Sequence, residues 1–383
     1  MTTTRIASRV PTRALAHPAP PSFRILCASL LAWALAAAPA LGEGDAGDAE
    51  CAARDNARPV CGFQNPEDLV VLPGEAALLV SEYGRAAGGR AGRLALFVLA
   101  DDARHVVFEC GRAPAEAMPG WGDPECQTPP SEAFSPHGID LVRRDDGRLA
   151  LLVIQHGDRE AVEHFEVQGE GQDWQLSWRG CVAAPDDASL NDVIAFPDGR
   201  FYATKMMSLG HDARELFAMP TEPTGEVHAW TPGQGYAVIP GTRAMMPNGL
   251  EASPDGAIVY MNASGEGVIR KVEAATGREL GRAEVVSPDN VTWAPDGQRL
   301  LIASLMPAKP EVFEACQKLT RGACGVGFSI VAVDAATMKN EGAIYTSDGS
   351  PMGAGTVGLQ VGNELFVGSF AGDRILRVDL GGS

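Results

Sequence analysis

The segment Asn191-Asp-Val-Ile-Ala-Phe-Pro-Asp-Gly199 has two later counterparts, Asn248-Gly-Leu-Glu-Ala-Ser-Pro-Asp-Gly256 and Asp289-Asn-Val-Thr-Trp-Ala-Pro-Asp-Gly297. In each of them an Asn or Asp stands eight residues before the Gly of a Pro-Asp-Gly turn. Glu67-Asp-Leu-Val-Val-Leu-Pro-Gly74 is a looser copy. Short apolar runs on both sides of such a turn are typical of β-hairpins. The recurrence therefore predicts a repeated β-unit.

Six such units follow one another along the chain, a little under 60 residues apart on average. Their turns lie at Gly74, Gly147, Gly199, Gly256, Gly297 and Gly362. Uneven spacing of this size fits four-stranded blades with outer loops of variable length. We therefore expect an all-β, six-bladed β-propeller over residues 61–383, with a central channel. The alternatives are a β-helix, which the irregular period disfavours, and a pair of β-sandwiches, which the repeated turn disfavours.

We expect little helix, with short candidates only near 310–320 and 212–218. The strand before each turn is expected to be the innermost of its blade, lining the channel. Equivalent leading residues of these strands would then meet at one end of the channel.

The residues expected to meet there carry oxygen donors. They are Glu67, Asp68, Asn191, Asp192, Asn248, Asp289 and Asn290. A single Asn or Asp near a turn more often caps it, but three copies in one register favour a metal site. Carboxylate and amide oxygens without Cys or imidazole favour Ca²⁺, because Mg²⁺ keeps more water and fewer protein ligands.

Two histidines lie close to this column in the predicted fold. His137, in Ser135-Pro-His-Gly-Ile139, stands ten residues before Gly147, and His156 ends the following strand. Both are expected on the second blade. A pair of imidazoles beside a metal can act as a general base and the partner that orients it.

The N-terminus has the features of a secretory signal peptide. Four Arg residues, an apolar run from about Ile25 to Ala37 and small residues near Ala40 predict cleavage after about residue 42. The run is short for a membrane anchor, the alternative interpretation, and no later stretch is apolar enough to span a bilayer. Residues 43–60 are expected to form a flexible leader. The sequence thus predicts a secreted or periplasmic protein without a membrane span after cleavage.

The charge of the chain excludes one class of partner. Loss of the four Arg residues of segment 1–42 takes the net charge from −18 to about −22. Such a chain repels the phosphates of nucleic acid and attracts divalent cations. The oligomeric state is left open.

Seven cysteines follow residue 42, and export makes disulfides plausible. Proximity in sequence suggests Cys110–Cys126 and Cys316–Cys324, leaving one thiol over among Cys51, Cys61 and Cys181. Zinc is not expected, because there is no Cys-x-x-Cys pair. The sequence also contains no Gly-x-Ser-x-Gly elbow, phosphate-binding loop or dinucleotide fingerprint.

Taken together, these segments resemble the paraoxonase family. The resemblance runs over about residues 62–380 and rests on the order of six segments. They are Pro66–Leu69, Ser135–Ile139, Leu151–His156, Leu190–Ile194, Asn248–Gly256 and Asp289–Val291. The Asn-Gly and Ser-Pro-Asp-Gly elements also occur in gluconolactonase-like and strictosidine-synthase-like propellers, whereas the two His segments favour paraoxonases.

The resemblance implies a calcium-dependent hydrolase of lactones and aryl esters, with a small-molecule ester or lactone as substrate. It implies a catalytic Ca²⁺ held by Glu67, Asn191, Asn248, Asp289 and Asn290. It implies a structural Ca²⁺ held by Asp68, Asp192 and the backbone carbonyl of Ile139. His137 would be the water-activating base and His156 its partner.

The chain departs from the family in two ways. Members tether their ends by a disulfide, but no Cys follows Cys324, so we expect ring closure by pairing of 375–379 with an N-terminal strand. The segment Lys205–Gly210 stands where the family tends to carry polar and aromatic residues. Two other functions stay open. One is a gluconolactonase-like sugar-lactone hydrolase without the paired His, and the other is a non-catalytic, calcium-stabilised binding propeller.

Overall fold

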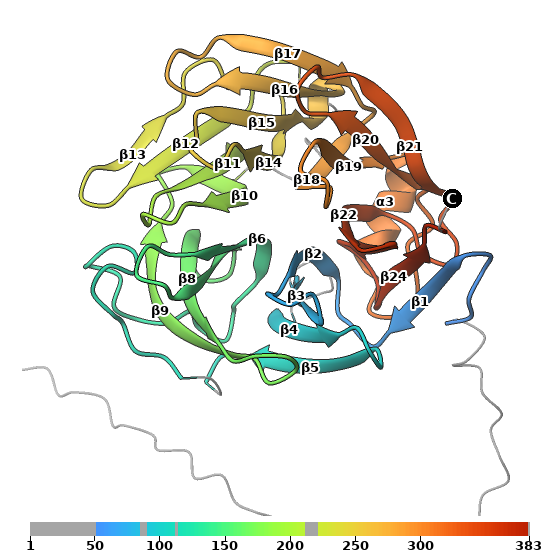
Figure 1. Cartoon of the computed structure of the whole chain (residues 1–383), viewed down its shortest axis with the longest axis horizontal. Helices are drawn as coiled ribbons and strands as arrows, with labels where there is room; N and C mark the ends of the chain where they lie inside the picture. The colour runs from blue at the N-terminus through green and yellow to red at the C-terminus, as the bar shows by residue number, and fades with distance from the viewer. Residues whose placement is uncertain (1–50, 85–89, 112–113, 211–220, 382–383) are drawn as a thin grey trace, which may run out of the picture. The chain divides into compact units, whose positions relative to one another are not determined.

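A computed structural model describes residues 51–84, 90–111, 114–210 and 221–381. Over these residues the chain forms six four-stranded antiparallel sheets, which stand around a central channel like the blades of a propeller (Figure 1). The predicted six-bladed β-propeller is confirmed. The predicted signal peptide, the start of the leader and the helix expected at 212–218 lie outside the described residues.

Blades one to five each take four consecutive strands. The first blade consists of β2 (Pro66–Val71), β3 (Ala77–Glu82), β4 (Arg93–Val98) and β5 (Ala103–Phe108). The second consists of β6 (Pro136–Arg143), β7 (Leu149–Gln155), β8 (Ala161–Gln168) and β9 (Gln175–Ala183), and the third of β10 (Ala188–Ala195), β11 (Phe201–Ser208), β12 (Glu226–Thr231) and β13 (Gly235–Val238). The fourth consists of β14 (Pro247–Ala252), β15 (Ile258–Ala263), β16 (Val268–Glu273) and β17 (Glu279–Glu284), and the fifth of β18 (Pro288–Trp293), β19 (Arg299–Leu305), β20 (Phe328–Asp334) and β21 (Asn340–Ser347).

The sixth blade joins the two ends of the domain. It consists of β22 (Gly355–Val361), β23 (Glu364–Ser369), β24 (Arg374–Asp379) and, outermost, β1 (Ala57–Cys61). Ring closure by pairing of the last strand with an N-terminal strand was predicted, and the antiparallel register Ala57↔Val378 to Cys61↔Arg374 confirms it. The part of the expected leader from Ala57 to Val60 is therefore a strand. That prediction was wrong there, because β24 offers these residues an unpaired edge.

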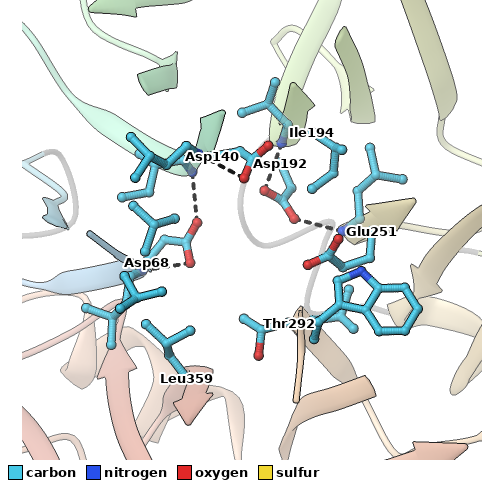
Figure 2. A pocket seen from close by; sticks show the side chains of 16 residues that line it. Asp68, Asp140, Asp192, Ile194, Glu251, Thr292 and Leu359 are labelled. Carbon is cyan, nitrogen blue, oxygen red and sulfur yellow. Dashed lines mark hydrogen bonds between the residues drawn. The ribbon is translucent and has the colours of Figure 1, made fainter. Parts of the chain in front are cut away.

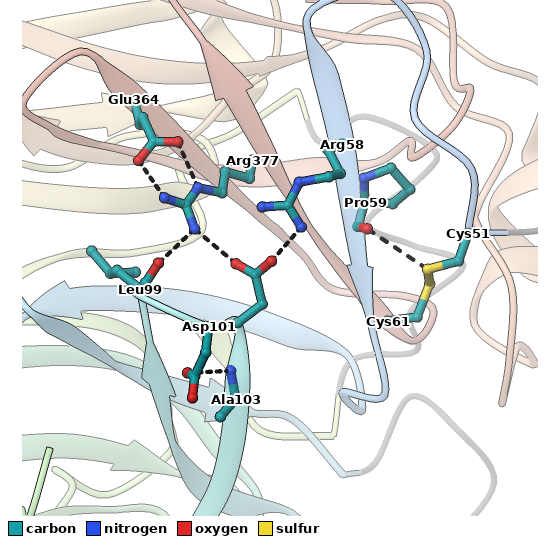
Figure 3. A network of polar contacts seen from close by, with 10 residues as sticks. Cys51, Arg58, Pro59, Cys61, Leu99, Asp101, Ala103, Glu364 and Arg377 are labelled. Atoms are coloured by element: carbon teal, nitrogen blue, oxygen red, sulfur yellow. Dashed lines mark hydrogen bonds and ion pairs between the residues drawn. A yellow bond between two sulfur atoms is a disulfide. The ribbon is translucent and has the colours of Figure 1, made fainter. Parts of the chain in front are cut away.

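The junction of the sixth and first blades is held by an arginine. Arg377 on β24 donates hydrogen bonds to the carbonyl of Leu99 and to Asp102 at 2.7 Å each, and it also binds both oxygens of Glu364 (Figure 3). Arg58 on β1 binds the other oxygen of Asp102. One carboxylate thus ties both strands at the closing seam to the first blade.

The six predicted turns all connect the first and second strands of a blade, and those first strands surround the channel (Figure 1). Strands here bury both faces because each sheet packs between two neighbours. In β7, for example, Leu151 and Val153 pack toward the first blade, whereas Leu152 and Ile154 pack toward the third. This follows from the two-residue period of a strand, and it explains the unbroken apolar runs in the sequence.

Outside the blades, α3 (Pro310–Cys316) fulfils the expectation of a short helix near 310–320, and η2 (Ser264–Glu266) is a single 3₁₀ turn. Among the described residues we find no helix with the length and apolarity that crossing a membrane requires.

Three disulfides join Cys51 to Cys61, Cys126 to Cys181 and Cys316 to Cys324. The predicted Cys316–Cys324 pair is confirmed, but the predicted Cys110–Cys126 pair is wrong. The loop after β5 runs along the outer strand β9, where the amide of Asp123 donates to the carbonyl of Cys181 at 2.8 Å. Cys126 is thereby brought to Cys181, while the Cys110 thiol donates to the carbonyl of Pro130.

We expect Cys126→Ser to lower the free energy of unfolding by about 2–4 kcal/mol, because the disulfide closes a loop of 55 residues. Cys110→Ser is the matched control, since this half-buried thiol is unpaired, and it should cost much less. Denaturant unfolding measures both values. A Cys110–Cys126 peptide in a non-reduced digest would contradict the assignment.

Candidate active site

A β-bulge interrupts all six innermost strands at the same place. In β10, Leu190 pairs with Lys205 and Val193 with Ala203, so that Asn191 and Asp192 together oppose a single residue. The same irregularity occurs at the start of β2, β6, β14, β18 and β22. A bulge changes the direction of the side chains it contains. We call the first residues of the six bulges the column: Glu67, His137, Asn191, Asn248, Asp289 and Thr356.

Contacts between blades show that this column converges. Asn290 donates from its side chain to Glu67 Oε1 at 2.9 Å, although the two residues are 223 positions apart. Asn248 hydrogen-bonds to Asp289, and His137 Nε2 lies 3.6 Å from Glu67 Oε1. Thr356 donates to the carbonyl of Glu67 at 2.7 Å. The structure thus brings together residues of the first, second, fourth, fifth and sixth blades.

Three oxygens of this cluster are buried and have no hydrogen-bond partner. They are Glu67 Oε2, Asn191 Oδ1 and Asn248 Oδ1, and each comes from a different blade. A buried oxygen without a donor is costly and calls for an explanation. A hard cation supplies one, because carboxylate and amide oxygens are its usual ligands. The residues present therefore fit the predicted ion.

Amide oxygens are essential to that fit. Among the described residues, no three His, Cys, Asp or Glu side chains come close enough to hold a metal ion by themselves. The set therefore depends on Asn191 and Asn248 as well as on the acids.

The electrostatics of the column are those of acids buried without a counter-ion. Burial, followed by the charge of Asp289, raises the pKa of Glu67 well above its usual range, although the Asn290 hydrogen bond opposes this. Burial also raises the pKa of Asp289 to about 7, against the hydrogen bond from Asn248. A bound cation would favour the ionised form of both groups.

Deeper in the channel, a cavity of about 210 Å³ is lined by four acids, Asp68, Asp140, Asp192 and Glu251, and by no Lys or Arg (Figure 2). Asp68 accepts from the amides of Leu69 and Ile139 at 2.8 Å each. Asp192 accepts from Val193 and Leu250 at 2.8 and 2.7 Å.

Each carboxylate therefore joins its own strand to a strand of the next blade. Asp140 does the same by accepting from Ala195 at 2.7 Å. Burial, and then the charge of the neighbouring acid, raises the pKa of both Asp68 and Asp192. Asp68, Asp192 and Ile139, the predicted ligands of the second ion, thus all line this cavity.

The two predicted catalytic histidines are in contact. His137 stands in the column and His156 at the end of the neighbouring strand, and the distance from His137 Nδ1 to His156 Nε2 is 3.3 Å. Burial, and next the adjacent His156, lower the pKa of His137 to about 3, opposed by a hydrogen bond to the Asn191 backbone. His137 is therefore neutral at neutral pH, and only the neutral ring can accept a proton.

Sequence reasoning missed Asp140 and Glu251 of the cavity, and it missed three residues around the column. Thr356 completes the column, but its segment lacks the Asn or Asp that marks the others. Tyr83 follows β3, and its ring centroid lies 5.2 Å from that of His137. Glu160 lies 2.9 Å from His156 Nδ1 through both carboxylate oxygens. The spacing of four residues between His156 and Glu160 could have indicated this contact.

Comparison with known proteins gives a match over part of the chain. Residues 143–300 match the family model described as SMP-30/Gluconolactonase/LRE-like region. No curated protein matches the chain. Two solved structures of low identity are similar in fold. One is a gluconolactonase of Xanthomonas campestris, with 17% identity, coverage of 84% of this chain and 89% of that one, and a TM-score of 0.49. The other is a luciferin-regenerating enzyme, with 12% identity, coverage of 83% and 92%, and a TM-score of 0.48.

The family match names gluconolactonases and not paraoxonases. It runs from the end of β6 to the start of β19 and so takes in most of the second blade, the third and fourth blades and the first strand of the fifth. It includes Asn191, Asn248 and Asp289, but not His137. It favours the sugar-lactone alternative over the paraoxonase resemblance, and it supports lactone hydrolysis in general.

We expect calcium to raise the melting temperature, by mass action on a site present only in the folded chain. At a free concentration 100 times Kd the gain is about 2.7 kcal/mol. Asn191→Ala should remove most of the shift, whereas Asn363→Ala, in an exposed turn, should keep it. Thermal unfolding in EDTA and in calcium measures the shift. Equal melting temperatures of the wild-type protein in both would contradict a calcium site.

Proposed function

We propose that this protein is a calcium-dependent hydrolase of lactones, with aryl esters as further substrates. The observation that carries the proposal is that three unpartnered oxygens and a neutral imidazole meet at one end of the channel. Acceptor oxygens suit a cation, and a neutral imidazole suits a water molecule that must lose a proton.

The residues that would hold the ion are Glu67, Asn191, Asn248, Asp289 and Asn290. When bound, the cation would act as a Lewis acid that polarises the carbonyl group of the substrate. A second ion would be held by Asp68, Asp192 and the carbonyl of Ile139, and it would stabilise the joints between blades that these acids already bridge.

His137 would perform the proton transfer. Its Nε2 atom faces Glu67 at the column, so it can take a proton from a water molecule there as the water oxygen attacks the carbonyl carbon. The same nitrogen would then return the proton to the alkoxide oxygen when the ester bond breaks. His156, against Nδ1 of His137, would hold the ring in place.

A sugar-lactone hydrolase is the second candidate, and the match of residues 143–300 favours it. Such an enzyme would use the same cation without depending on the histidine pair. The acidic channel also suits a non-catalytic, calcium-stabilised propeller. We also propose that the protein is exported to an oxidising compartment, and the three disulfides support this.

Activity assays with phenyl acetate, an alkyl δ-lactone and glucono-δ-lactone separate these candidates. We expect turnover that EDTA abolishes and calcium restores. Preference for the sugar lactone, with turnover unchanged by His156→Gln, would support the second candidate. Calcium-dependent melting without turnover on any of the three substrates would mean that the site is structural.

His137→Gln should reduce turnover by about 10²–10⁴-fold, the usual contribution of a positioned general base. The calcium-induced shift in melting temperature should remain, because His137 is not among the proposed ligands. Steady-state kinetics and thermal unfolding of the same preparation measure the two effects. Full activity in this variant would remove the imidazole base from the mechanism.

Asp289→Ala should lose both the calcium shift and the activity, because it removes a proposed ligand carboxylate. Asp255→Ala, in the exposed turn of the fourth blade, is the matched control and should keep both. Turnover by Asp289→Ala at the wild-type rate would show that the ion at the column is not catalytic.

A further inference from the structure

We propose that Glu160 is a positioning residue that fixes the direction of every hydrogen bond in the relay Glu160–His156–His137. This inference depends on the proposed function in one respect only: the role of a His137 Nε2 atom that carries no proton. The arrangement itself follows from the contacts.

The first step is the tautomer of His156. A carboxylate can only accept hydrogen bonds, and both oxygens of Glu160 lie 2.9 Å from His156 Nδ1. The proton of a neutral His156 must therefore be on Nδ1. Its Nε2 atom is then a lone-pair acceptor.

The second step passes this direction on to His137. His156 Nε2 lies 3.3 Å from His137 Nδ1, so an accepting Nε2 is matched by a proton on His137 Nδ1. The ring of His137 also hydrogen-bonds to the backbone of Asn191, whose carbonyl is a second acceptor for that proton. A neutral His137 then has no proton on Nε2, the nitrogen that lies 3.6 Å from Glu67 Oε1. Glu160 thus leaves the nitrogen at the column free to accept a proton.

Glu160 itself is held where it can act. Its side chain is only 12% exposed, and that of His156 is 8% exposed, so water competes weakly for their contact. The amide of Ala184 donates to the Glu160 carbonyl at 2.9 Å. The amide of Leu190, which precedes Asn191 in the column, lies 3.4 Å from Glu160 Oε2. The carboxylate therefore sits at the joint between the second and third blades.

Without the carboxylate the relay has no fixed direction. A proton on His156 Nε2 would point at His137 Nδ1 and shift the proton of His137 to its Nε2 atom. This Nε2 atom could then no longer accept a proton from water. A carboxylate that holds a histidine in its working tautomer is the role of the Asp in serine protease triads. Here the carboxylate acts through two rings.

The direct test is NMR of the ring nitrogens in protein labelled with ¹⁵N-histidine, assigned with His137→Gln and His156→Gln. We expect His156 and His137 of the wild-type protein both to carry their proton on Nδ1. In Glu160→Leu, His156 should lose this tautomer, and in Glu160→Asp it should keep it. Protons on both nitrogens of His156, or an unchanged pattern in Glu160→Leu, would overturn the proposal.

Kinetics add a second readout. Glu160→Leu should lower turnover by about 10²-fold or more while leaving the calcium-induced melting shift in place, and Glu160→Asp should recover part of the turnover. Glu226→Leu is the matched control, since Glu226 lies 3.2 Å from a ring nitrogen of His228 away from the column. It should leave turnover unchanged. The expected tautomers without turnover in any form would overturn the proposed function and leave the role of Glu160 standing.

Discussion

The channel of this propeller gathers acids, and among the residues that the structure describes no Lys or Arg lines the cavity beside them. Four acids line the deep cavity, and Glu67 and Asp289 stand at the column beside it. Removing a carboxylate from water costs several kcal/mol unless the charge is compensated. The backbone amides that bind Asp68, Asp140 and Asp192 supply part of this compensation, since each carboxylate accepts two of them. A bound cation would supply the rest, so that folding, ion binding and activity would depend on one another.

The bulges make this concentration of charge possible. A regular strand turns alternate residues to opposite faces, so only one of two successive side chains would face the channel. With a bulge, Asn191 belongs to the column and Asp192 to the cavity below it. The same device in β2 separates Glu67 from Asp68. Two adjacent residues can therefore belong to the two proposed ion sites at different depths.

The histidine relay has a different origin, because its members lie close together in the chain. His137, His156 and Glu160 all belong to the second blade or to the loop after β7, so that one hairpin and one turn bring them together. The family match does not extend to His137. It does include the other two members, His156 and Glu160.

Much of the fold and part of the candidate site could be predicted from the sequence. The six turns, the innermost position of the strands before them and the column of Asn and Asp residues follow from local periodicity, which each hairpin imposes on its own residues. The contact of His137 with His156 was predictable for the same reason.

Tertiary packing alone decided the rest. Cys126 meets Cys181 because the loop after β5 crosses an outer strand, and residues 57–60 form a strand because the last blade leaves an edge open. Thr356 joins the column only through its bulge, and Glu160 gains its role only through the ring it faces. Pairings between distant segments depend on the shape of the whole ring, and a local sequence pattern contains no information about that shape.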